Sequence, residues 1–216
     1  MSAGDDPAKI TWFEDEMQAL GQTAQQLGLP FAVHTGAAEG CKQALRAGAR
    51  SLEHCYLIDD EAIAMAEQVG AFLMPTMQMT REDKELLKAG KLPEQAVWKF
   101  RRDVAAIEEA QIRIAQSKAK VAFGTDCGMF PFSEGVLEFQ AMVAAGITPA
   151  RALKAGTSLA AELLQRDDLG ALAPGKQADM VAMPGDPFKD ISVTEKVEFV
   201  MKAGRVYRYD SFDILR

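Results

Sequence analysis

The sequence predicts an α/β fold in which parallel strands are buried on both faces, and three observations support this. Four short apolar segments alternate with segments whose apolar residues recur every three or four positions, which is the pattern of a parallel sheet with helical crossovers. The apolar segments lack polar alternation, so each strand is expected to be covered on both sides, as in a barrel or a doubly wound sheet. After Gly170 the composition turns rich in glycine and proline and then in strand formers, which predicts a small β appendage.

The first half of the chain predicts three strands, at 31–34, 51–54 and 71–74, each preceded by a helix. The helix from residue 14 has one apolar stripe and ends before Gly28, and the next two end before Gly48 and Gly70. Glycine after a helix is expected because it adopts the left-handed conformation at little cost. Asp59 is expected to cap the third helix. Residues 2–9 read as a loop.

The second half predicts a long helix around 97–114, a fourth strand at 121–124, and helices at 133–145 and 149–164. Thr148 followed by Pro149 is a favourable start for the last of these helices. In the tail, strands are expected at 178–183, 197–201 and 205–208, the last two joined as a hairpin.

Composition limits the function. The chain has 216 residues, of which 48% are hydrophobic and 25% charged, as expected of a globular protein. Its net charge of -7 argues against nucleic-acid binding. The sequence contains no run of about 18 apolar residues, so no membrane-spanning helix is expected. The N-terminal residues do not resemble a secretory signal. Three cysteines, an odd number without a CxxC pair, are expected to stay reduced, which favours a cytoplasmic location.

The candidate site consists of His34, His54 and Asp126, which lie at or just beyond the ends of predicted strands. In parallel α/β folds the carboxyl ends of the strands bind ligands. Two imidazoles and a carboxylate suit a divalent metal such as zinc, and Asp126 could act as the base toward an activated water. The alternative is structural: the histidines are core residues, and Asp126 caps the turn that follows it.

The cysteines offer a second, weaker possibility. Cys127 could serve as the nucleophile of an unrelated α/β thiol enzyme, but such a thiol needs a base within hydrogen-bonding reach. Cys55 and Cys127 each follow a candidate site residue, and neighbours on a strand point in opposite directions. The alternative role for all three cysteines is small apolar packing.

Taken in order, the motifs resemble the later strands and the tail of the amidohydrolase superfamily. Val33-His34 with the helix after it resembles the fifth strand and helix, 51–54 the sixth strand, 72–76 the seventh and 123–126 the eighth. The segments 169–187 and 202–205 resemble the superfamily's β-sandwich tail and its closing hairpin. Within the superfamily, the chain resembles imidazolonepropionase-related proteins and the Xaa-Pro and Xaa-Arg dipeptidases.

This resemblance implies the carboxyl-terminal half of a (β/α)8 TIM-type barrel, about four βα units over residues 1–168, and a small β-sandwich tail over residues 169–216. It implies a metal-dependent hydrolase that cleaves C–N bonds in dipeptides or cyclic amides through a metal-activated hydroxide. His34 and His54 would bind one metal of the family's binuclear centre. Asp126 would bind the other metal and carry the proton to the leaving amine.

The chain also departs from the family pattern. The family has an HxH pair on its first strand and a carboxylated lysine on its fourth, and neither has a counterpart here. Residues 2–7 resemble the loop after the fourth strand, so the first half of the barrel is expected to be missing. At most one metal site is then expected from this chain, and the resemblance implies a divalent metal, zinc, in it. The alternative is a non-catalytic half barrel that assembles with itself or with a complementary chain.

Overall fold

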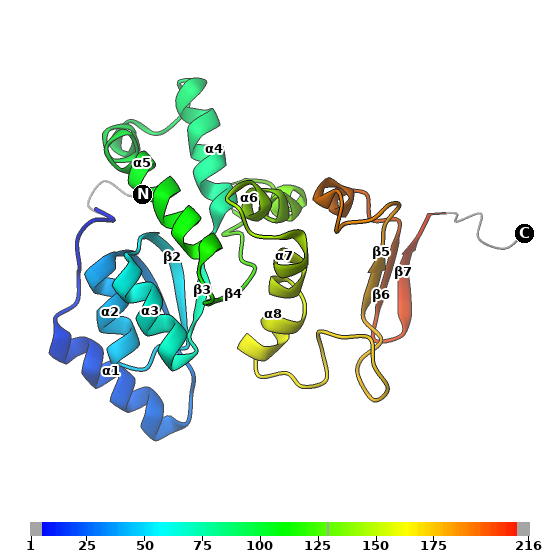
Figure 1. Cartoon of the computed structure of the whole chain (residues 1–216), viewed down its shortest axis with the longest axis horizontal. Helices are drawn as coiled ribbons and strands as arrows, with labels where there is room; N and C mark the ends of the chain where they lie inside the picture. The colour runs from blue at the N-terminus through cyan, green and yellow to red at the C-terminus, as the bar shows by residue number, and fades with distance from the viewer. Residues whose placement is uncertain (1–5, 129, 211–216) are drawn as a thin grey trace, which may run out of the picture.

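The computed structural model describes residues 6–128 and 130–210. The elements in chain order are α1 (Glu14–Leu27), β1 (Ala32–Ala37), α2 (Ala38–Arg46), β2 (Ser51–Leu57), α3 (Asp60–Val69), β3 (Phe72–Met74), α4 (Met77–Lys88), α5 (Glu94–Gln116), β4 (Lys120–Val121), η1 (Phe132–Leu137), α6 (Glu138–Ala144), α7 (Pro149–Ala155), α8 (Ser158–Leu163), β5 (Met180–Ala182), η2 (Ile191–Glu195), β6 (Phe199–Lys202) and β7 (Arg205–Tyr209). The strands form a parallel sheet, β1-β2-β3-β4, and an antiparallel sheet, β5-β6-β7. Figure 1 shows helices around the first sheet and the second sheet at the other end of the molecule. The predicted α/β class with a parallel sheet is confirmed.

Several helices begin and end where the sequence predicted. Gly28 follows α1 in the left-handed conformation, with φ of 64°. Asp59 caps α3 by accepting a hydrogen bond of 2.9 Å from the Ala62 N–H. Thr148 caps α7 by accepting one of 3.3 Å from the Arg151 N–H. Among the helices of the described residues, none is long and apolar enough to cross a membrane.

The helices cover one face of the parallel sheet with a continuous apolar core. Leu52, Leu73 and Val121 lie in register on neighbouring strands and are fully buried. They pack with residues from α2, α3, α5, α6 and α7. The next row, His34 beside Glu53, faces the opposite way because successive side chains of a strand alternate between faces. His34 therefore lies on the face that this core does not occupy.

Several elements differ from the sequence-based predictions. Residues 77–88, for which the sequence predicted no helix, form α4. The single helix expected over 149–164 is divided into α7 and α8 at Gly156, where a Cβ would lie 2.8 Å from the Phe139 ring. The fourth strand is shorter than expected because the Phe123 N–H donates to the Ala155 carbonyl of α7 instead of to a strand. The segment after β4 is thus free to turn toward the site.

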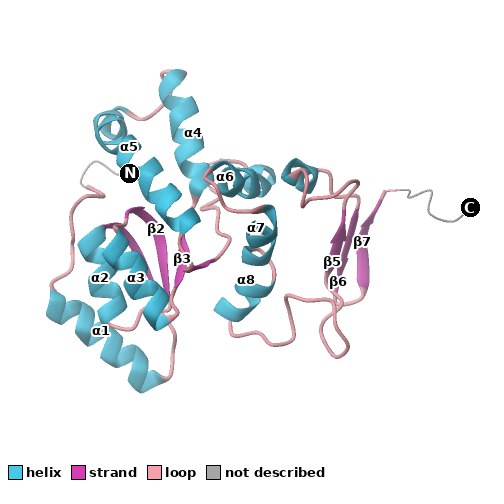
Figure 2. Ribbon diagram, in the orientation of Figure 1, coloured by secondary structure: helices cyan, strands magenta, loops and turns pink. Residues whose placement is uncertain are grey.

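The tail contains one three-stranded antiparallel sheet within the described residues. Figure 2 shows its strands in magenta, apart from those of the parallel sheet. β6 and β7 form the predicted hairpin, whose turn has Ala203 and Gly204 at φ of 48° and 77°. Gln140 of α6 donates a hydrogen bond to Glu195 of η2, so the segment between β5 and β6 contacts the helical part of the chain.

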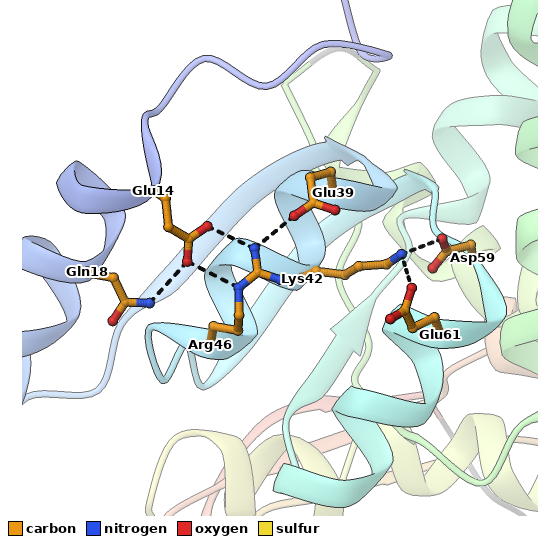
Figure 3. A network of polar contacts seen from close by, with 7 residues as sticks. All are labelled: Glu14, Gln18, Glu39, Lys42, Arg46, Asp59 and Glu61. Carbon is orange, nitrogen blue, oxygen red and sulfur yellow. Dashed lines mark hydrogen bonds and ion pairs between the residues drawn. The ribbon is translucent and has the colours of Figure 1, made fainter.

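Charged side chains connect α1, α2 and α3 at the surface (Figure 3). Arg46 of α2 lies 2.8 Å from a carboxylate oxygen of Glu14 in α1. Lys42, one turn earlier in α2, lies 2.8 Å from Asp59 and also pairs with Glu61 in the first turn of α3. Most of these side chains are substantially exposed, so the network is expected to orient the helices more than to stabilise the fold.

Candidate functional site

The two histidines of the chain lie side by side on neighbouring strands. His34 is in β1 and His54 is in β2, and their ring centroids are 4.4 Å apart, with the ring planes at 66°. His34 is exposed, whereas only 8% of His54 is accessible. Both strands extend beyond the predicted ends, to Ala37 and Leu57, so the histidines lie within strands and not at their last residues.

Asp126 reaches the same place from the loop after β4. His34, His54 and Asp126 all line one cavity of about 150 Å³. Its other lining residues come from the segment before α1, from β1 and β2, from α2, and from the first turns of α1 and α4; among them are Lys9, Ile10, Trp12, Met17, Thr35, Tyr56 and Met79. The structure therefore brings the three predicted site residues together, although they are up to 92 positions apart in sequence (126 − 34).

The backbone around this cavity is strained. His54, Thr76 and Asp126 have φ of 71°, 45° and 54°, in the left-handed region that glycine favours. Each such residue costs of order 1–3 kcal/mol, and threonine is an especially unfavourable case because it is β-branched. The neighbouring residue Cys55 also has a positive φ, of 53°, and the pairing of β1 with β2 is irregular at this level. Strain of this kind is concentrated at functional sites, which supports the location of the candidate site.

Hydrogen bonds at one ring nitrogen hold His54. Its Nδ1 lies 2.9 Å from the Thr76 hydroxyl oxygen and 3.3 Å from the Tyr56 hydroxyl oxygen. The Tyr56 ring is also stacked on the imidazole, with centroids 5.2 Å apart. Burial, together with the charge of His34, lowers the pKa of His54 to about 4, although Asp126 acts in the opposite direction. His54 is therefore neutral near pH 7, which is the form that donates a lone pair to a metal.

The chemistry of these donors fits a divalent cation. Histidine ligands of metals commonly hydrogen-bond through their second ring nitrogen, as His54 does to Thr76. His34 and Asp126 add an imidazole and a carboxylate on the same cavity, and both groups are zinc ligands. In the described residues, however, no three His, Cys, Asp or Glu side chains are already arranged to hold a metal ion. The ligand set His34, His54 and Asp126 remains a prediction.

The cysteine thiols lie in other surroundings. Cys41 and Cys55 are buried, with accessibilities of 0% and 1%, in the core of the sheet's helical face. Burial raises the pKa of Cys55 well above its usual range, which disfavours the reactive thiolate. Cys127 is half-buried, and its sulfur accepts a hydrogen bond of 2.9 Å from the Thr125 hydroxyl. These contacts provide no base for a thiol nucleophile.

Sequence reasoning missed the residues that support His54. Thr76 lies at the end of the segment that resembles the seventh strand, and neither Thr76 nor Tyr56 was assigned a role. Glu138, which anchors the residues after Thr76, lies at the start of α6 and is only 1% accessible. The available signal was a charged residue directly between the apolar residues Leu137 and Phe139, but this signal does not identify the partner of Glu138.

Comparison with known proteins identifies the family. Residues 2–207 match the amidohydrolase family. The chain belongs to the amidohydrolase family. This membership agrees with the resemblance predicted from the strand motifs, and it covers both the parallel sheet and most of the tail.

Curated relatives support the same assignment. The chain is 27% identical over 218 residues to ochratoxinase of Aspergillus niger, an alignment that covers 96% of this chain and 44% of that protein. It is 25% identical over 207 residues to imidazolonepropionase of Cutibacterium acnes, covering 91% of this chain and 46% of that protein. The amidohydrolase chain thus spans slightly less than half the length of these relatives.

This chain also covers about half of the similar solved structures. A Xaa-Pro dipeptidase crystallised with methionine in its active site superposes with a TM-score of 0.90 at 32% identity, over 96% of this chain and 52% of that one. Ochratoxinase of A. niger superposes with a TM-score of 0.84 at 26% identity, over 97% of this chain and 48% of that one. The described fold is therefore similar to about half of a prolidase-like amidohydrolase.

Proposed function

We propose that this chain carries the His34, His54 and Asp126 part of a metal-dependent amidohydrolase that hydrolyses C–N bonds in small amides. The convergence of these three side chains on one strained cavity carries the proposal. Membership of the amidohydrolase family supports a hydrolase, and the dipeptidase among the similar structures supports dipeptides as a substrate class. The imidazolonepropionase relative supports cyclic amides as the alternative class.

In this proposal His34, His54 and Asp126 are the residues that would hold a divalent cation, zinc by the chemistry of the donors. When bound, such a cation supplies Lewis-acid activation of a water molecule and of the amide carbonyl. Asp126 accepts a proton from the attacking water and transfers it to the amide nitrogen as the C–N bond breaks. The water oxygen ends in the carboxylate product and the proton on the released amine. The neutral state of His54 keeps a ring lone pair available for the cation.

Metal retention tests the proposed site. The protein is loaded with zinc and desalted, and its metal content per chain is measured beside that of a His34→Ala/His54→Ala double variant. We expect close to one retained zinc in the wild type and none in the double variant. Cys127→Ser serves as the control, because its thiol contacts Thr125 instead of either histidine, and it should retain the wild-type amount. Equal zinc content in the wild type and the double variant, or none in either, would contradict a histidine site on this chain.

The open edges of the parallel sheet favour a second proposal, which concerns assembly. Among the strands of residues 6–128 and 130–210, β1 and β4 each pair with only one other strand, and the chain spans about half the length of its relatives. We propose that residues 1–168 are half of a (β/α)8 barrel, and 169–216 part of a β-sandwich, completed by a complementary chain or by a second copy. Light scattering should then report a dimer in isolation, or a heterodimer when the complementary half is added. A chain that stays at 23.5 kDa in both experiments would contradict assembly.

A further inference from the structure

The start of α4 is buried and lacks the usual cap. The residues of its first turn, Met77 to Thr80, are 1–8% accessible. The first N–H groups of a helix have no partner within the helix, and in a buried turn water cannot supply one. Thr76 is the N-cap residue of α4. A threonine at this position commonly accepts a hydrogen bond from one of these N–H groups with its side-chain oxygen. Here the Thr76 side chain makes no such hydrogen bond.

Glu138 replaces that cap from another helix. Its two carboxylate oxygens accept hydrogen bonds from the Met77 N–H at 2.9 Å and from the Gln78 N–H at 2.7 Å. Glu138 is the first residue of α6, about 60 positions further along the chain, and it is 1% accessible. These donors and the helix dipole favour the ionised carboxyl, although burial of the Glu138 side chain raises its pKa. Glu138 therefore satisfies the two donors that follow Thr76.

This replacement leaves the Thr76 hydroxyl free for another partner. Its oxygen lies 2.9 Å from Nδ1 of His54, and Thr76 itself is 3% accessible. Because the Gln78 N–H is already bonded to Glu138, the lone pairs of the Thr76 oxygen are available to accept a hydrogen bond from the Nδ1–H group of His54. A histidine that donates through Nδ1 carries its lone pair on Nε2, the nitrogen with which it can bind a ligand.

We propose that Glu138 is a positioning residue for His54: by capping α4 in place of Thr76, it leaves the Thr76 hydroxyl to accept a hydrogen bond from Nδ1–H and so fixes the imidazole with its lone pair on Nε2. Glu138 does not touch the cavity and acts only through α4 and Thr76. The inference concerns the same cavity as the proposed function, but it is tested in the metal-free protein. Its failure is therefore distinguishable from failure of the metal site.

Nitrogen-15 NMR of the imidazole rings tests this directly. The chain has only two histidines, so His34→Ala assigns both ring systems. At pH 9, where Glu138 is charged, we expect wild-type His54 to show the widely separated nitrogen shifts of a fixed Nδ1–H tautomer. In Glu138→Gln the amide cannot accept both N–H groups, so Thr76 is drawn toward capping and the two nitrogen shifts of His54 should converge. Glu138→Met, which keeps the buried volume without polar atoms, provides a second variant and should give the same convergence.

Control variants separate positioning from general loss of stability. Thr76→Ser should keep the wild-type tautomer and Thr76→Val should lose it, because only serine retains the hydroxyl. Thr148→Ala removes the cap of α7 and should leave the His54 shifts unchanged. Tyr56→Phe should change them little, because its hydroxyl makes the longer contact to Nδ1. A wild-type His54 without the Nδ1–H tautomer, or one that Glu138→Gln and Glu138→Met leave intact, would overturn the proposal.

Discussion

The buried carboxyl of Glu138 should make the stability of the fold fall as the pH rises. Burial raises its pKa from 4.5 to about 8, against the opposing effects of the Gln78 and Met77 N–H groups and the charge of Arg81. Since the folded state holds the proton more tightly than the unfolded chain, the stabilising contribution is complete below pH 4.5 and is lost as the pH passes 8. Integrating this difference gives a loss of roughly 3–4 kcal/mol between pH 5 and pH 8.

Urea unfolding of the wild type and of Glu138→Gln at several pH values measures this loss. The glutamine carries no charge, so the difference in unfolding free energy between the two proteins isolates the carboxyl. From pH 5 to pH 8 we expect the unfolding free energy of the wild type to fall by about 3–4 kcal/mol relative to that of Glu138→Gln. Glu85→Gln is the control: Lys88 lowers the pKa of this exposed glutamate, so its small effect should have the opposite sign. A Glu138 difference that is constant over this range would refute the reasoning.

The remaining predictions compare two arginines. Arg151→Ala removes guanidinium hydrogen bonds to the Ala115 and Ala119 carbonyls at 2.7 and 2.8 Å, and should lower the unfolding free energy by about 1–3 kcal/mol because these partly buried acceptors lose their partner. Arg46→Ala breaks exposed ion pairs in the network of Figure 3 and should cost about 1 kcal/mol or less. Adding about 1 M salt should abolish the loss of unfolding free energy in Arg46→Ala and leave the loss in Arg151→Ala unchanged. An Arg46→Ala loss that is the same at low and high salt would contradict this contrast.

Local features of the chain were predictable because short-range chemistry decides them. The caps of α3 and α7 follow from the preferences of Asp59 and Thr148, and the end of α1 follows from Gly28. The alternation of apolar strands with helices predicted the parallel sheet in the same way. Where a distant contact competes with the local preference, prediction failed, as at Gly156, where close approach to the Phe139 ring accompanies the break between α7 and α8.

Some residues of the candidate site were predicted from the sequence, and others were not. His34, His54 and Asp126 were predicted because each residue type follows an apolar strand, and the structure places all three on one cavity. Thr76 and Glu138 were not predicted, since their roles depend on contacts across 22 and about 60 positions of sequence. Nothing in the composition of α4 or α6 indicates which helix end Glu138 caps.

The sequence by itself determined the alternation of strands with helices, the caps and the chemistry available at the strand ends, because these depend on neighbouring residues and on alternation along one strand. Only the tertiary structure decided that His54 is buried and neutral, that its Nδ1 meets Thr76, and that Glu138 holds the start of α4. Burial and long-range hydrogen bonds are properties of the packed chain. They arise when β2, α4 and α6 come together, and no segment carries them alone.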